Sequence, residues 1–193
     1  MATILLTGFD AFGGAAANSS WDAVQLAARD WPESSALVTA CLPVEFGRAG
    51  DILDDLIGRL RPDLVIATGV AAGRTKVTPE RIAINLADAR IPDNAGAEPR
   101  DEPIVAEGPD AYFTRLPVQD MVERMTAAGI PAALSLSAGT YVCNDTMYRM
   151  LHSLSSQTTL AGFIHVPDSA ELPVASSAAA LRLALESGLA ALG

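Results

Sequence analysis

Short runs of apolar and β-branched residues alternate along this chain with stretches whose apolar residues recur at helical spacing. Such alternation is typical of βα units built around a largely parallel sheet. It predicts strands over residues 3–7, 36–42, 64–68, 133–137 and 161–166. Helices are expected over residues 20–29, 49–60, 118–128, 144–154 and 176–192. The pattern therefore predicts an α/β fold.

The segment 69–120 does not follow this alternation. It contains six of the prolines, many charges and few long apolar runs, so we interpret it as an irregular excursion with room for a hairpin. The sequence contains no internal repeat, low-complexity tract or interdomain linker. We therefore expect residues 1–193 to form a single domain.

The composition excludes several classes of protein. The chain has 193 residues, half of them apolar, and 13 Lys and Arg against 23 Asp and Glu give a formal net charge of −10. A chain of this length buries about 70% of its surface on folding, so it is not intrinsically disordered. Because no Lys/Arg cluster is present, neither nucleic acid nor an anionic membrane is an expected partner.

The two ends of the chain suggest a cytoplasmic protein. The apolar start has no basic segment before it and stops at Asp10, far short of the ~18 residues that a membrane span needs. The Ala/Leu-rich tail is interrupted by Arg182 and Glu186, which indicates an amphipathic helix. We therefore predict neither an export signal nor a membrane anchor.

The chain has two cysteines, Cys41 and Cys143, and neither lies in a metal-binding spacing. We expect no metal and no cofactor. Cys41 lies inside an apolar predicted strand and is typical of a small buried side chain. Cys143 stands between a predicted strand-and-turn segment and a helix, where unpaired backbone N–H groups stabilise a thiolate and can hold an oxyanion. The alternative for Cys143 is likewise a buried, inert thiol.

A thiolate nucleophile needs a histidine, and the chain has only two. His152 lies about 13 Å along the same predicted helix as Cys143, at 1.5 Å per residue, and is out of reach. His165 ends a predicted strand and emerges at the same sheet edge as Cys143. Spacing does not choose the acid that orients it, because five candidates remain: Glu80, Asp88, Asp93, Asp145 and Asp168.

Five motifs, in order, resemble the pyroglutamyl peptidase I family of cysteine peptidases over nearly the whole chain. They are LLTGFDAFGG at 5–14, TPERIAIN at 78–85, ARIPDN at 89–94, SAGTYVCN at 137–144 and GFIHVP at 162–167. The resemblance implies a catalytic triad of Cys143, His165 and Glu80. It also implies a three-layer α/β/α sandwich with a mostly parallel, open twisted sheet of the phosphorylase/hydrolase-like kind.

The family resemblance implies a reaction and a pocket. The reaction is removal of an N-terminal pyroglutamyl residue from a peptide through a thioester. A neutral lactam suits an apolar, aromatic slot. The residues that stand at family positions around such a ring or near the site are Phe9, Phe12, Asn18, Val70, Arg90, Ile91, Tyr141 and Val142. For Arg90 the resemblance implies support of the oxyanion, and a surface salt bridge is the alternative. The resemblance further implies a homotetramer.

Two departures from the family and two rival functions bear on this interpretation. Val70 stands where the family commonly has Gln, which removes a side-chain amide from the pocket, and Asp145 stands where a His is common. We expect Asp145 to point outward, because its charge would oppose a thiolate at Cys143. The rivals are a phosphorylase- or nucleosidase-like enzyme and a non-catalytic binder of pyroglutamyl termini. No phosphate-loop pattern supports the first, and the intact triad argues against the second.

Overall fold

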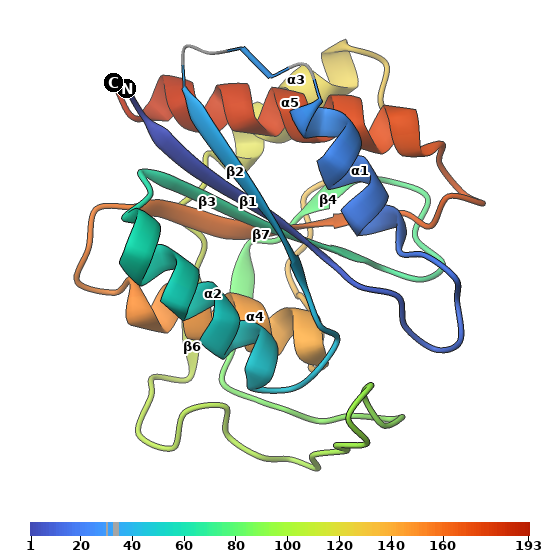
Figure 1. Cartoon of the computed structure of the whole chain (residues 1–193), viewed down its shortest axis with the longest axis vertical. Coiled ribbons are helices and arrows are strands. Elements are labelled where there is room, and N and C mark those ends of the chain that lie inside the picture. The colour runs from blue at the N-terminus through green and yellow to red at the C-terminus, as the bar shows by residue number, and fades with distance from the viewer. Residues whose placement is uncertain (30, 33–34) are drawn as a thin grey trace.

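The fold is built on an open, mostly parallel sheet (Figure 1). The computed structural model describes residues 1–29, 31–32 and 35–193. Within these residues the main sheet has five strands in the order β2-β1-β3-β7-β4. Their bounds are Thr3–Phe9 for β1, Ala36–Leu42 for β2, Leu64–Val70 for β3, Thr78–Pro79 for β4 and Leu160–Val166 for β7. The first four strands in that order are parallel, and only β4 runs antiparallel to β7.

Helices cover both faces of this sheet and give three layers (Figure 1). On one face lie α1 (Ser19–Ala28), α3 (Val118–Ala127) and α5 (Val174–Ala191). On the other lie α2 (Arg48–Leu60) and α4 (Val142–Ser153). The predicted α/β/α architecture is confirmed, and every predicted helix is present within a few residues of its expected bounds.

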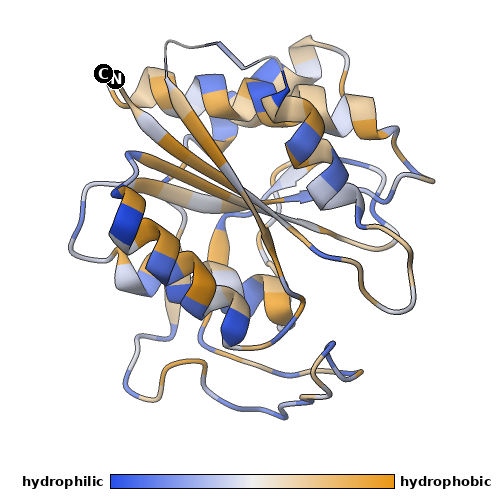
Figure 2. Cartoon of the chain, in the orientation of Figure 1, coloured by the Kyte–Doolittle hydropathy of each residue, from blue (hydrophilic) through white to orange (hydrophobic). Residues whose placement is uncertain are grey.

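The sheet forms because its strands are apolar on both faces. β1 and β3 are buried along almost their whole length, as continuous apolar runs in a covered parallel sheet should be. Figure 2 shows hydrophobic strands between helices striped with hydrophobic and hydrophilic residues. Leu53 and Ile57 of α2 are buried while Asp55 is exposed. In α5, a Cβ at Gly188 would meet a Leu64 side-chain carbon at 2.6 Å, so glycine lets this helix lie close to the sheet.

The irregular excursion is confirmed, and it contains an antiparallel pair formed by β5 (Ile82–Ile84) and β6 (Ala111–Phe113). The predicted strand at 133–137 is wrong. This stretch makes isolated parallel bridges, Ala132 with Val77 and Ser135 with Glu80. Backbone hydrogen bonds join residues 131–135 to residues 77–81, which include the two-residue strand β4, but the pairing does not continue to residues 136–137.

None of the helices in the described part of the chain is long and apolar enough to cross a membrane.

Candidate active site

The carboxyl edge of the parallel sheet brings together segments that are far apart in the sequence. β1 ends at Phe9, β3 at Val70 and β7 at Val166. The ladder between β3 and β7 places Gly69 opposite His165. Open parallel sheets bind ligands at this edge, so the strand order alone puts His165 where a reaction can occur.

The first turn of α4 carries Cys143. The helix begins at Val142, two residues earlier than predicted, after Tyr141 in an extended conformation. The first bond of the helix runs from the Asp145 N–H to the Tyr141 carbonyl at 3.1 Å. The N–H of Cys143 precedes it and has no intrahelical acceptor. The thiol therefore lies at the positive end of the helix dipole, which favours a thiolate.

Gly69 makes room for the sulfur. A Cβ at this position would lie 2.9 Å from Cys143 Sγ and 3.0 Å from a ring carbon of Phe163. Carbon atoms do not approach sulfur this closely without displacement. The absence of a side chain on β3 thus allows Cys143 to sit against the sheet, beside the strand that carries His165.

Cys143, His165 and Glu80 form a connected chain. His165 Nδ1 lies 2.7 Å from Glu80 Oε1, and both side chains are buried. Cys143 lies near enough to the same imidazole to raise the pKa of His165, and both residues line one cavity. Since Nδ1 is occupied by Glu80, Nε2 is the nitrogen left for the sulfur. This is the order of nucleophile, base and orienting acid found in nucleophilic hydrolases.

His165 and Glu80 both have pKa values that differ from their ordinary values. Burial alone lowers the pKa of His165, but the charge and hydrogen bond of Cys143 and those of Glu80 outweigh burial and raise the pKa to about 9. Burial likewise raises the pKa of Glu80, but the hydrogen bond and charge of His165, helped by Ser135 and Arg74, leave it below its ordinary value. At neutral pH the imidazole is therefore charged beside an ionised carboxylate.

Arg74 is a fourth member that the sequence analysis missed. Its Nη1 lies 2.7 Å from Glu80 Oε1, the same oxygen that contacts His165. The guanidinium is held in place by Thr78 Oγ1 at 2.7 Å and by the Ser137 carbonyl at 3.3 Å. Arg74 thus shares the negative charge of Glu80 with the imidazole.

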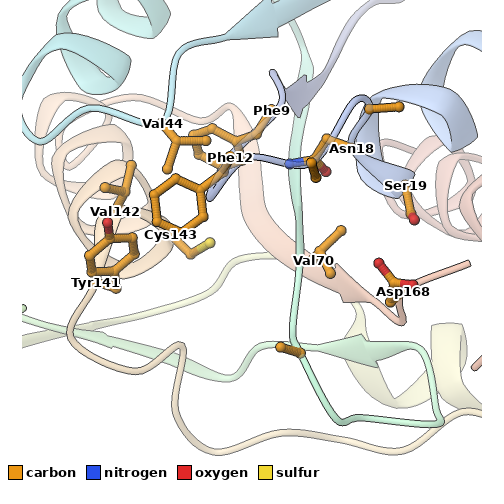
Figure 3. Close-up of a pocket in the computed structure, with 13 residues that line it drawn as sticks. Phe9, Phe12, Asn18, Ser19, Val44, Val70, Tyr141, Val142, Cys143 and Asp168 are labelled. Carbon is orange, nitrogen blue, oxygen red and sulfur yellow. The ribbon is translucent and has the colours of Figure 1, made fainter. Parts of the chain in front are cut away.

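An apolar cavity of about 230 Å³ opens beside the sulfur; we call it the aromatic cavity. Figure 3 shows the rings of Phe12 and Tyr141 next to Cys143, with Val70 across the cavity. Tyr141 packs on Phe12 at 5.6 Å between centroids and on Phe46 at 5.1 Å. These aromatic contacts fix the wall. The predicted pocket residues that line this cavity are Phe9, Phe12, Asn18, Val70, Tyr141 and Val142.

Asn18 lines the aromatic cavity, but its polar atoms are already engaged. Its Nδ2 donates to the Asp10 carbonyl at 2.9 Å, and its Oδ1 accepts from the N–H and the hydroxyl of Ser20. It caps the N-terminus of α1. Asn18 therefore holds the loop that forms the cavity wall.

A second, larger hollow of about 800 Å³ also borders the Cys143 side chain; we call it the charged cavity. It is lined by His165, Arg74, Asp88 and Arg90. The remaining two predicted pocket residues, Arg90 and Ile91, line this hollow and not the aromatic cavity, and Ile91 is 53% exposed. Cys143 lines both hollows. The sulfur thus stands at their junction.

The prediction that Asp145 points outward is wrong. Asp145 is 2% exposed, and its carboxylate accepts hydrogen bonds from the Gly47 N–H at 3.0 Å and from Arg149 Nε at 3.0 Å. Burial raises the pKa of Asp145, although Arg149 and the Gly47 N–H oppose that shift. The carboxylate is used to join α4 to the residue before α2.

The other cysteine and the other histidine lie outside the site. Cys41 is exposed, because β2 is an edge strand of the sheet, so the expected burial is wrong. Burial of part of the thiol and the charge of Asp10 nevertheless raise the pKa of Cys41. His152 lies near the end of α4, away from the site as predicted; it is partly exposed, with its Nδ1 2.9 Å from the Tyr112 hydroxyl.

Val44 and Asp168 also line the aromatic cavity. Val44 follows β2 and was missed by the sequence analysis, whereas Asp168 follows β7 and was considered only as an acid that could orient the histidine. The rule that found His165, a position just beyond the carboxyl end of a parallel strand, would have indicated both as cavity residues. Among the described residues, no group of three or more His, Cys, Asp or Glu side chains could hold a metal ion.

Comparison with known proteins decides the family. Residues 2–192 match the pyroglutamyl peptidase family. The chain belongs to this family. The expectation drawn from the five sequence motifs is confirmed.

Similar proteins and solved structures cover nearly the whole chain. A pyrrolidone-carboxylate peptidase of Chromobacterium violaceum is 45% identical over 98% of this chain and 93% of its own length. One of Cupriavidus taiwanensis is 48% identical over 86% and 79%. The crystal structure of pyroglutamyl peptidase I from Bacillus amyloliquefaciens superposes with a TM-score of 0.94 at 38% identity, covering 98% of both chains. A mutant pyrrolidone carboxyl peptidase from Pyrococcus furiosus gives 0.94 at 35%, covering 99% and 100%.

Proposed function

We propose that this chain removes an N-terminal pyroglutamyl residue from peptides, with Cys143 as nucleophile, His165 as base and acid, and Glu80 as the group that orients the imidazole. The observation that carries the proposal is the Cys143–His165–Glu80 chain at the mouth of an aromatic cavity. Family membership supports it.

The reaction divides into two steps. The Cys143 thiolate attacks the carbonyl carbon of the scissile peptide bond, outside the lactam ring. The N–H groups at the start of α4 stabilise the oxyanion that forms. As the C–N bond breaks, His165 gives its proton to the leaving amine, and a thioester remains. Water then loses a proton to His165 and attacks the thioester, and the C–S bond breaks to release pyroglutamate. Glu80 holds Nδ1 throughout, so that Nε2 carries the transferred proton.

The aromatic cavity explains the choice of a lactam. Ordinary peptides carry an N-terminal ammonium, which is costly to bury in apolar surroundings. The lactam is uncharged and flat, and it fits between the Phe12 and Tyr141 rings and Val70. Val70 offers no side-chain amide, so backbone groups must hydrogen-bond the lactam. The carboxylate of Asp168 lies at the exposed rim.

The direct test compares pyroglutamyl and prolyl amides of the same chromophoric amine. Because the prolyl amide brings a charge into the cavity, its kcat/KM should be lower by about 100-fold or more. Cys143→Ala should abolish hydrolysis, whereas Cys41→Ala should leave it within about twofold. Equal turnover of both amides, or an active Cys143→Ala variant, would contradict the proposal.

The wider organisation of the molecule is part of the same proposal. Residues 1–193 act as one peptidase domain, since the family match runs from residue 2 to 192. The enzyme works in the cytoplasm as a homotetramer, which the resemblance to its family implies. Light scattering on the purified chain tests the assembly: a mass four times 20.0 kDa is expected, and a monomer at micromolar concentration would overturn it.

A further inference from the structure

The two cavities that meet at Cys143 differ in one decisive residue. Both are lined by Phe12, Val70 and Tyr141 in addition to the sulfur, but only the charged cavity is lined by His165. The proton donor of the reaction is therefore reached from the charged cavity and not from the aromatic cavity.

This asymmetry assigns the two halves of the substrate, on the basis of the proposed function. The leaving amine receives its proton from His165, so it must lie within hydrogen-bond reach of that ring. The pyroglutamyl ring occupies the aromatic cavity, whose lining does not include His165. The peptide that follows the scissile bond then extends into the charged cavity.

The charged side chains that line the charged cavity differ in whether they already have an ion-pair or hydrogen-bond partner. Arg74 is paired with Glu80 at 2.7 Å. Arg90 is exposed, and among the described residues it has no ion pair or hydrogen bond from its side chain. Asp88 is half-buried and likewise has no side-chain partner in that part of the chain. One guanidinium and one carboxylate thus remain available to a ligand.

We propose that the charged cavity is a subsite for the leaving peptide, in which Arg90 selects substrates that carry a carboxylate close to the scissile bond. A guanidinium forms two parallel hydrogen bonds with a carboxylate and is suited to this task. The negative charge of Asp88 repels the same substrate carboxylate, so it limits the preference for substrates that carry one. The substrate class is therefore short pyroglutamyl peptides, of which pyroglutamyl dipeptides are the smallest.

Two sources could supply the carboxylate: the C-terminus of a short peptide, or an acidic side chain next to the scissile bond. Three substrates separate them. Pyroglutamyl-alanine has a free C-terminus, pyroglutamyl-alanine amide has no carboxylate, and pyroglutamyl-aspartate α-amide has only the side chain. At low ionic strength, kcat/KM should exceed that of the alanine amide by about 3- to 10-fold for at least one carboxylate substrate, and salt should reduce the ratio.

Two variants with opposite expected effects on the carboxylate preference test the role of Arg90. In Arg90→Gln the ratio of kcat/KM for the preferred carboxylate substrate to that for the alanine amide should fall to about one. In Asp88→Asn the ratio should rise by about 2- to 5-fold, because the opposing charge is removed. Arg59→Gln is the matched control: Arg59 lies on α2 with Asp55 as its partner, away from both cavities, and its removal should leave the ratio unchanged.

The outcomes separate this proposal from the proposed function. If the wild-type enzyme hydrolyses the alanine amide but shows no carboxylate preference, the subsite is wrong and the peptidase function stands. If Arg90→Gln slows all three substrates by the same factor, Arg90 acts on the oxyanion and the proposal is overturned. If the wild-type enzyme hydrolyses none of the three, both proposals fail.

Discussion

The aromatic cavity and the charged cavity border the same sulfur atom, but the first offers a substrate apolar packing and the second offers charged groups. In the first, packed rings fix a shape, and the titratable groups that the described residues place in its lining besides the thiol are the Tyr141 hydroxyl and Asp168 at the rim. Burial and the charges of Asp93, Cys143 and Glu98 raise the pKa of Tyr141 to about 12, so its hydroxyl stays neutral. In the second, an imidazole, two guanidinium groups and a carboxylate face the same space.

This difference teaches where each kind of substitution should act. Changes in the aromatic cavity alter how well the ring binds, because packing is present in the ground state and in the transition state alike. Changes in the charged cavity alter proton transfer and should act on kcat and its pH dependence.

Glu80→Gln has the largest effect that we expect on the charged side, apart from loss of the nucleophile itself. An amide at this position favours the wrong tautomer of His165 and does not stabilise the imidazolium, so kcat should fall by about 10³- to 10⁴-fold. Steady-state kinetics with a pyroglutamyl amide measure the loss. Glu123→Gln, at an exposed position on α3, is the control and should be unaffected. If the Glu80→Gln enzyme kept a tenth of the normal kcat, Glu80 would not be the group that orients and stabilises the His165 imidazolium.

Phe12→Ala tests the aromatic side. Loss of the ring that packs on Tyr141 should reduce kcat/KM by about 10- to 100-fold, mainly through KM, since burial of an aromatic side chain is worth about 1.5–3 kcal/mol. Phe113→Ala is the matched control, because Phe113 is 65% exposed and lines neither cavity. A fall in kcat at constant KM would contradict the division between the cavities.

Arg74→Met should give a smaller change, visible chiefly in the pH dependence. The wild-type rate should decline at high pH as His165 loses its proton, with an apparent pKa of about 9 that belongs to the coupled pair. Removal of the Arg74 charge leaves more of the Glu80 charge for the imidazolium, which raises the pKa of His165. The alkaline limb of the kcat/KM curve should therefore move to higher pH. An alkaline limb that stays at the same pH, or that moves to lower pH, would show that Arg74 does not act through Glu80.

Asp145→Ala should affect stability and leave the chemistry alone. The variant leaves the Gly47 N–H and the Arg149 guanidinium without their acceptor, which should lower the free energy of unfolding by about 1–3 kcal/mol. Urea unfolding measures this. Asp145→Asn keeps an acceptor for the Gly47 N–H and should lose less. Unchanged stability together with altered kcat would show that this carboxylate acts on Cys143.

The regular half of the fold could be predicted because its signals are local. β1, β2, β3 and β7 are continuous apolar runs, and the amphipathic pattern of α2 marks its buried face. The sheet-edge rule then placed Cys143 and His165 together without any knowledge of strand order. The stretch at 133–137 looked like a strand by the same criterion, but among the described residues its backbone pairs through isolated bridges with the short segment 77–81.

The remaining errors concern contacts between distant segments. Nothing within the sequence pattern distinguished Glu80 from the other acidic candidates, because its pairing depends on an antiparallel contact of β4 with β7. Asp145 was misplaced because the side of α4 that faces away from the sulfur is covered by the start of α2. Cys41 was misplaced because the pattern of β2 did not reveal that it lies at the sheet edge.

The most direct measurement compares the two thiols of the wild-type enzyme. Iodoacetamide at pH 7, followed by peptide mapping over time, should label Cys143 at least about tenfold faster than Cys41, with activity lost in step with the label on Cys143. This order is informative because Cys41 is the more exposed of the two, so access alone would favour the opposite result. Faster labelling of Cys41, or full activity after Cys143 is alkylated, would contradict a thiolate nucleophile held beside His165.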